Sequence, residues 1–155
     1  MNIFLNGFNL NFGGGENILQ STLSGLDAQC SSSNSNVTAL VPNSKLSEYK
    51  NNYKNIKFYC LPAFLEKSVF SFFNYLFLIP ILVWFGKFDK VLSMGNFAIP
   101  TRKPQVLYFH WPYAVYSKSE WACFVNKSEL INRLIRKLLF FITVRFPDIV
   151  VAQTP

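Results

Sequence analysis

The sequence has few of the residues that enzymes commonly use for metal binding or nucleophilic attack. Its 155 residues contain one histidine and three cysteines. A single histidine excludes a metal site built on two histidines, and Cys30, Cys60 and Cys123 lie too far apart for a zinc motif or a disulfide framework. The three aspartates are isolated, and no Gly-x-Ser-x-Gly nucleophile motif occurs. We therefore expect no metal and no other cofactor, and reduced thiols in a cytosolic protein.

Acidic residues are also scarce, so the formal net charge is +7. The excess is concentrated in residues 66–155, where eleven Lys and Arg residues stand against five Asp and Glu. The chain also contains 17 Phe. A basic and aromatic half predicts an anionic membrane surface as partner rather than nucleic acid. The first ten residues, MNIFLNGFNL, have no basic region, so we expect no signal peptide.

Apolar periodicity predicts alternating strands and helices. Short β-prone runs predict strands at 2–8, 37–41, 56–60, 90–93, 105–109 and 148–152. Helical spacing predicts helices at 16–26 and 130–143, and residues 45–55 are a helix or loop on the surface. Strands apolar on both faces that alternate with helices indicate an α/β fold with a Rossmann-like, mostly parallel sheet covered by helices. The apolar stripe of the helix at 130–143 consists of Ile131, Leu134, Ile135, Leu138, Leu139 and Ile142.

The longest apolar run, residues 68–85, allows three interpretations. It is a buried amphipathic helix of a soluble domain, a helix lying in the membrane interface between Lys67 and Lys87, or a transmembrane helix. Trp84 would lie at the headgroup level in the second case. Asn74 and Pro80 interrupt the run and argue against a span. Peripheral binding would use Lys67, Trp84 and Lys87. It would also use three cations beside the apolar stripe of the helix at 130–143, which are Arg133, Arg136 and Lys137.

Three consecutive glycines, Gly13, Gly14 and Gly15, follow the first predicted strand and open the first predicted helix ahead of Glu16. Glycine loses the most backbone entropy on folding, so the cluster requires either a positive φ or a close approach to the backbone. A glycine-rich turn of this kind leaves helix N–H groups able to face an anionic or polar ligand. The alternative is a tight chain reversal only, since neither Gly-x-Gly-x-x-Gly nor a phosphate-loop motif is present.

His110 and Asn96 are the other candidate site residues. His110 ends a predicted strand, where it could hydrogen-bond a sugar hydroxyl or shift charge during a reaction. Otherwise it is a histidine satisfied by a backbone carbonyl beside Trp111. Asn96 follows another strand at the edge where open α/β sheets bind ligands, or else it is a turn residue with positive φ.

In order along the chain, GGGE (13–16), FDKVLSMGNFAIP (88–100), VLYFHWP (106–112), the basic helix at 128–145 and DIVVAQTP (148–155) resemble the N-terminal domain of GT-B-fold retaining glycosyltransferases of family 4. The resemblance implies one half of a GT-B fold, with the glycine-rich turn at the cleft and His110 on the transferred sugar. It also implies a nucleotide-sugar donor, a glycan or lipid-linked acceptor, and attachment to the anionic inner face of the membrane through residues 67–87 and 128–145.

The sequence departs from this family in one important respect. The family's C-terminal nucleotide-sugar domain, with its paired-glutamate motif, is not found in residues 1–155. We therefore expect residues 1–155 to be the N-terminal domain of a hexosyl-type transferase, truncated before that domain and inactive alone, because half a cleft cannot align donor and acceptor. The alternative is a non-catalytic membrane-associated α/β module or an inactive truncated remnant.

Overall fold

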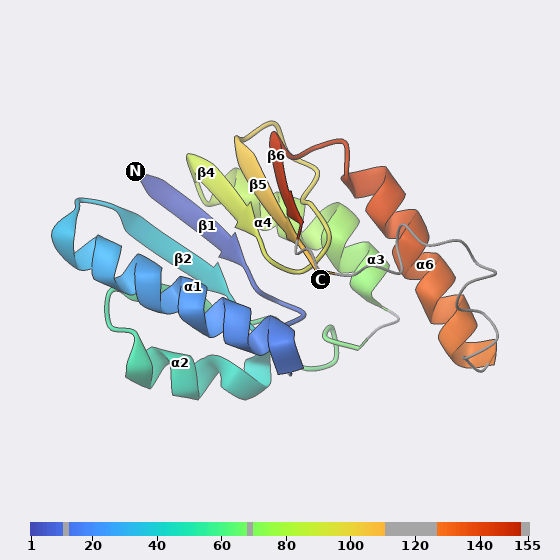
Figure 1. Cartoon of the computed structure of the whole chain (residues 1–155), viewed down its shortest axis with the longest axis horizontal. Coiled ribbons are helices and arrows are strands. Elements are labelled where there is room, and N and C mark those ends of the chain that lie inside the picture. The colour runs from blue at the N-terminus through green and yellow to red at the C-terminus, as the bar shows by residue number, and fades with distance from the viewer. Residues whose placement is uncertain (11–12, 68–69, 111–126, 153–155) are drawn as a thin grey trace.

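A six-stranded, entirely parallel sheet forms the centre of the computed structural model, which describes residues 1–10, 13–67, 70–110 and 127–152 (Figure 1). The strand order is β3-β2-β1-β4-β5-β6. Each neighbouring pair runs parallel, and the predicted α/β fold with a Rossmann-like parallel sheet is confirmed. The strands are β1 (Asn2–Asn6), β2 (Asn36–Leu40), β3 (Ile56–Tyr59), β4 (Lys90–Ser93), β5 (Gln105–Phe109) and β6 (Ile149–Ala152).

Two helices and a short 3-10 turn cover one face of the sheet. They are α1 (Gly13–Ser32), η1 (Asn43–Lys45) and α2 (Leu46–Asn52). Leu19 and Leu23 of α1 and Tyr49 of α2 are fully buried, and they pack on inward side chains of β1 to β3 such as Leu5 and Val37. The two βαβ crossovers put both helices on the same face, as right-handed connections require.

The opposite face is covered by a continuous helix in three parts and by a long later helix. The three parts are α3 (Ser71–Phe73), the π-helical η3 (Asn74–Leu78) and α4 (Ile79–Phe85). Pro80 has no N–H to donate to the preceding turn, and the wider π-helical turn lies just before it. α6 (Lys127–Thr143) follows β5 and contributes Leu139 and Phe140 to this core.

The helix across residues 70–85 is amphipathic rather than wholly buried. Tyr75, Ile79 and Val83 are fully buried, whereas Phe77 and Trp84 are exposed, Trp84 to 80%. Among the described residues, no helix is both long enough and apolar enough to span a bilayer.

A buried amide holds the loop that joins β4 to β5, where residues 94–104 connect the two strands without a helix. The Oε1 atom of Gln105 accepts hydrogen bonds from Ser93 Oγ at 2.9 Å and from Ile99 N at 2.7 Å. Its Nε2 atom donates to Ile99 O at 3.0 Å. Both polar atoms of the Gln105 side chain are thus hydrogen-bonded in the core, and they tie the loop that carries Asn96 to both flanking strands.

Several sequence expectations require correction. The helix predicted at 16–26 begins at Gly13 itself and continues to Ser32, so it is longer than predicted at both ends. The serines at the C-terminal end of this helix suit an exposed last turn. The hydroxyls of Ser31, in that turn, and of Ser33, just after it, donate hydrogen bonds to carbonyl oxygens of α1.

The apolar stripe of α6 faces away from the core. Of its six members only Leu139 is buried, because the sheet contacts the side of the helix that carries Leu139, Phe140 and Thr143. The edge strand β6 is also uncovered, since its residues Ile149–Ala152 are all exposed. Both features leave apolar side chains in solvent: Ile131, Leu134, Ile135, Leu138 and Phe141 on α6, and Ile149, Val150 and Val151 on β6.

Candidate functional site

The candidate site lies at the carboxyl edge of the sheet, where the strand order reverses between β1 and β4. The chain leaves β1 toward β2 and leaves β4 toward β5, so the segments that follow these two strands diverge. In open α/β sheets the ligand-binding crevice forms at such a switch point, and we call this place the crevice. The first turn of α1 follows β1 there, as the blue ribbon in Figure 1 shows. Asn96 follows β4 and His110 follows β5, so the topology brings the predicted glycine turn, asparagine and histidine to one edge.

Asn96 and His110 form a reciprocal pair. The backbone N–H of His110 donates to Asn96 Oδ1 at 2.8 Å, and Asn96 Nδ2 lies 3.2 Å from His110 Nε2. Because a backbone N–H can only donate, it identifies the Asn96 oxygen, so the Asn96 amide N–H must face Nε2. Nε2 is therefore the acceptor, and the neutral ring carries its proton on Nδ1.

The surroundings keep His110 neutral. Burial lowers the pKa of the His110 imidazole below its usual 6.5. A proton on Nε2 would also face the donor Nδ2 of Asn96, so the pair opposes protonation. Nδ1 has no hydrogen-bond partner among the described residues. The Nδ1 atom is itself buried, so its N–H is a donor without a described acceptor, and a ligand oxygen would have to reach it beneath the surface.

The backbone of Asn96 has a φ of 68°, a conformation that asparagine tolerates better than most residues. The interpretation of Asn96 as a turn residue with positive φ is therefore confirmed, and its side chain also contacts His110. Ligand binding by Asn96 stays a prediction. For His110, the described partner is the Asn96 side chain rather than a backbone carbonyl. Trp111 lies outside the described residues, as do Cys123 and residues 153–155.

The three consecutive glycines at the start of α1 differ in backbone conformation and in the space around them. Gly13 has a φ of +65°, which explains its identity by backbone conformation alone. A Cβ on Gly14 would meet no atom within 4 Å. A Cβ on Gly15 would lie 2.9 Å from Leu10 Cδ2 and 3.3 Å from His110 Nε2, so Gly15 lets the start of α1 pack directly on the histidine.

Glu16 is occupied by a structural contact. Its Oε1 forms an ion pair with Lys45 Nζ at 2.5 Å, and this contact joins the first turn of α1 to η1. The hydrogen bonds to Glu16 and Glu48 raise the pKa of the Lys45 ammonium. The carboxylate of Glu16 is thus held toward η1 and Lys45.

Sequence reasoning missed a buried polar group beside the loop that carries Asn96. The hydroxyl of Tyr75, which is fully buried, accepts a hydrogen bond from Asn9 Nδ2 at 3.2 Å. A Cβ on Gly95 would come within 2.5 Å of that hydroxyl, so the residue before Asn96 must be glycine. Burial raises the pKa of the Tyr75 phenol far above its ordinary value, although the nearby Asn6 amide and Arg136 guanidinium oppose this. The available signal was Asn6 and Asn9 at the end of an otherwise apolar strand.

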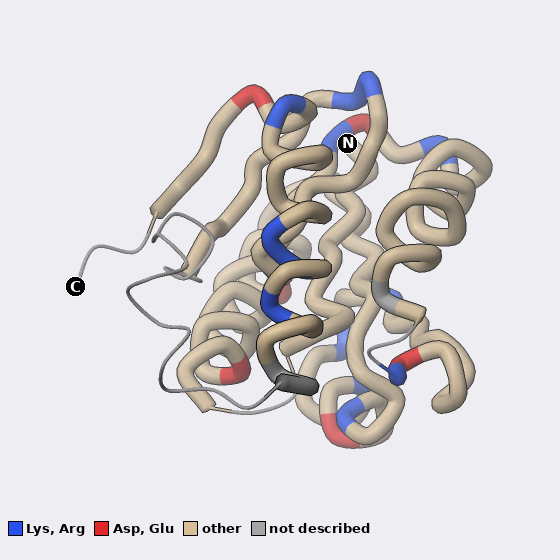
Figure 2. The backbone as a smooth tube through the Cα atoms, turned by 90° about the vertical axis from the view of Figure 1, so that its right-hand side faces the viewer, with Lys and Arg blue, Asp and Glu red and all other residues tan. Residues whose placement is uncertain are grey.

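The residues predicted to bind a membrane lie on the helices rather than in the crevice. Lys67 and Lys87 are exposed near the two ends of the helix at 70–85, and Arg136 is exposed on α6. Arg133 is partly buried, and Lys137 Nζ lies 5.9 Å above the centre of the Phe141 ring. Figure 2, in which α6 faces the viewer, shows Lys and Arg distributed along this helix.

No group of three or more metal-ligating side chains occurs among the described residues. Comparisons with protein-family models, with curated proteins and with solved structures found no match to this chain. The parallel sheet in the order 3-2-1-4-5-6 makes the protein an α/β protein of the Rossmann-like class, with its topological switch point between β1 and β4.

Replacing Gly15 by alanine tests the close approach of α1 to His110. The new Cβ would crowd Leu10 and His110 Nε2, so we expect Gly15→Ala to lower the free energy of unfolding by about 1 kcal/mol and to shift the His110 ring resonances. Gly14→Ala, with open space around its Cβ, should keep or raise stability by up to about 1 kcal/mol through helix propensity. Urea unfolding and histidine NMR measure both effects. Equal behaviour of the two variants would contradict the packing seen here.

The titration of His110 tests the tautomer and the role of Asn96. NMR should give a pKa below 6.5, and the single histidine makes the assignment unambiguous. Because the folded-state pKa is depressed, the stability linked to this group is present above pH 6.5 and is lost as pH falls below it. Asn96→Asp should raise the pKa, because a carboxylate accepts from a protonated Nε2. Asn96→Gly, which suits the positive φ, should not produce that rise, and a native pKa above 6.5 would refute the arrangement.

Proposed function

We propose that this domain is the N-terminal, acceptor-side half of a retaining glycosyltransferase of the GT-B type, which transfers a sugar from a nucleotide-sugar to a glycan or lipid-linked acceptor. The observation that carries the proposal is the neutral His110, held by Asn96 beside the glycine-rich start of α1 at the carboxyl edge of the sheet. The ordered motifs that resemble family 4 support the same assignment.

The chemistry of glycosyl transfer suits such a site. The sugar leaves an activated diphosphate, so the protein need not supply a nucleophile, and stabilising the oxocarbenium-like transition state and the departing phosphate is the main requirement. The Nδ1–H of His110 would donate to an oxygen of the transferred sugar. The first N–H groups of α1, at the positive end of the helix dipole, would face phosphate oxygens. A nucleotide-sugar domain is needed to complete the cleft, because positioning supplies much of the rate.

A second candidate function is a non-catalytic α/β module that binds membranes. The observation in its favour is the set of exposed aromatic side chains on the helix that covers the sheet, Phe73, Phe77 and Trp84. The two candidates differ in whether substitution of His110 changes turnover.

Turnover is measured with a nucleotide-sugar-binding domain present, in the same chain or as a purified partner. His110→Ala should lower kcat roughly tenfold or more, because one hydrogen bond in the transition state is lost, while the melting temperature changes little. Tyr53→Phe is the control, since it removes a hydrogen bond to Gln20 on the α1 and α2 face. A stable His110→Ala variant with native turnover would show that the histidine only packs, and no transfer by the native protein would favour the module.

We further propose that the domain binds peripherally to the anionic inner face of the membrane. The exposed aromatic residues Phe73, Phe77 and Trp84 line the outer side of the helix at 70–85. α3 contacts α6, so this row and the outward apolar side chains of α6 belong to neighbouring helices. Insertion of these side chains would add to the attraction of the surrounding cations, on the order of 1 kcal/mol for each Lys or Arg near the surface.

Co-sedimentation with vesicles of neutral or partly anionic lipid tests this arrangement. The native domain should bind anionic vesicles at low salt and release as salt rises. Lys87→Gln combined with Arg136→Gln should weaken binding about tenfold or more. Lys50→Gln combined with Lys54→Gln, an equal change of charge on the α2 side, should not. Binding that ignores lipid charge and survives alkaline carbonate would contradict peripheral attachment.

A further inference from the structure

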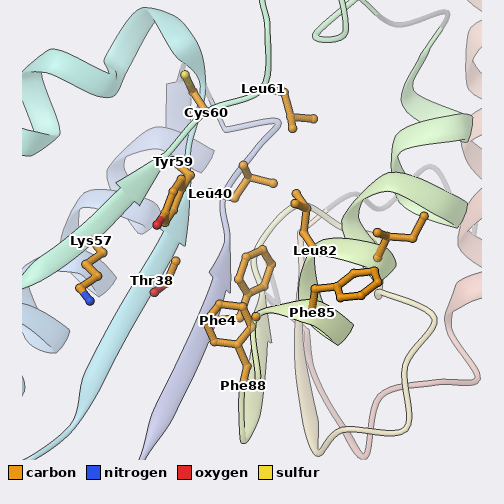
Figure 3. Close-up of a pocket in the computed structure, with 12 residues that line it drawn as sticks. Phe4, Thr38, Leu40, Lys57, Tyr59, Cys60, Leu61, Leu82, Phe85 and Phe88 are labelled. Carbon is orange, nitrogen blue, oxygen red and sulfur yellow. The ribbon is translucent and has the colours of Figure 1, made fainter.

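A groove of about 550 Å³ lies on the sheet face opposite α1 and α2 (Figure 3). Its floor is formed by β1, β2 and β3, and its wall by α4 and the turn that follows it. On this face α4 does not cover β3, so Lys57 is exposed and Tyr59 is 60% exposed. The groove is separate from the crevice that holds His110, and the inference below goes beyond the proposed function and does not depend on it.

The groove is polar at one side and apolar over the rest. Thr38 of β2 and Lys57 of β3 are direct partners in the strand register, and Tyr59 follows Lys57 by two residues, so all three side chains are on the same face of the sheet. Figure 3 shows their polar ends gathered on one side of the groove. The remaining labelled side chains are mostly apolar: Phe4, Leu40, Leu61, Leu82, Phe85 and Phe88.

Lys57 has no acidic partner to neutralise it in the described part of the chain. Both ion pairs found there are made by Lys45, with Glu16 and Glu48. The hydroxyls of Thr38 and Tyr59, which line the same groove, are further donors. The polar end of the groove therefore suits an anionic group that accepts several hydrogen bonds, and the adjoining walls suit a hydrocarbon chain.

We propose that this groove binds a long-chain fatty acid, with its carboxylate at Lys57, Thr38 and Tyr59 and its hydrocarbon chain along Leu40, Leu82 and Phe85. The volume is within the range of small-molecule sites, roughly 300–1,000 Å³, whereas an α-helix of a partner is about 10 Å across with its side chains. β3 is the edge strand and carries an exposed lysine, a feature that opposes pairing with the edge of a second copy. Phe85, exposed at the outer wall, leaves the apolar side accessible from solvent or from a lipid surface.

Calorimetric titration of the whole 155-residue protein with laurate, below the concentration at which it forms micelles, tests the proposal. Laurate should bind at one site. Lys57→Met keeps the apolar stem but removes the charge, so it should weaken binding about tenfold. Lys54→Met, the same change at an exposed lysine outside the groove, should leave affinity within about twofold. Dodecyltrimethylammonium, with the same chain and a cationic head, should bind at least about tenfold more weakly than laurate.

Thr38→Phe places a ring in the middle of the floor and should abolish laurate binding. A second measurement keeps the proposal testable if that variant folds poorly. Leu40 and Leu82 line the groove, whereas Leu19 and Leu23 are buried on the opposite face, so laurate should shift the methyl NMR resonances of the first pair and not those of the second.

Four results would overturn the proposal. The first is that laurate does not bind, and the second is that a folded Thr38→Phe variant binds laurate as the native protein does. The third is that laurate and dodecyltrimethylammonium bind with equal affinity and Lys57→Met has no effect. The fourth is a dimer in sedimentation that Thr38→Phe converts to a monomer, which would make a second copy the occupant. None of these results bears on the turnover test with His110→Ala, so failure of one proposal is distinguishable from failure of the other.

Discussion

The pairing of β1 with β4 is the constraint on which the other features of this structure depend. These strands are distant in sequence, yet they lie in register from Ile3 with Lys90 to Asn6 with Ser93. Their contact reverses the direction in which strands are added to the sheet, so the first two helices cover one face and the later helices cover the other. It also makes the carboxyl edge between them the place where loops diverge and polar side chains can gather.

The loop after β4 shows how the fold positions a polar pair without a helix to support it. Gln105 is buried and bonded to Ser93 and Ile99, so it fixes both ends of the segment that carries Asn96. Asn96 in turn sets the tautomer of His110 through a backbone and a side-chain contact. A buried amide network of this kind is stable only when each member is paired, which makes the geometry of the pair specific.

The surfaces away from the crevice are unusually apolar. The outward stripe of α6, the aromatic row on the helix at 70–85 and the exposed β6 strand all place large side chains in solvent. Contiguous apolar surface on a soluble domain marks an interaction site. The proposed membrane surface uses the two helices, and the proposed fatty-acid groove begins on the other flank of α4. The two sites would thus share a helix but bind through different sides of it.

Local patterns determined the elements of this protein. The strands at 90–93 and 105–109 follow from short β-prone runs, and the helix ending at 143 follows from apolar residues at helical spacing. Each of these signals acts within a few residues. The parallel order of the sheet follows from the alternation of strands and helices. Part of the site was also predictable, since glycines, an asparagine and a histidine that follow three strands of a parallel sheet must reach the same edge.

Tertiary structure decided which face each pattern uses. The apolar stripe of α6 is visible in the sequence, but only the packing of Leu139, Phe140 and Thr143 on the sheet turns that stripe outward. In the same way, Tyr75 reads as one apolar position in a long run until the fold places its hydroxyl against Asn9 and Gly95. Lys57, Thr38 and Tyr59 become a polar cluster only through strand pairing. Periodicity is a local property of the chain, whereas the partner that covers a face is set by contacts between residues far apart in sequence.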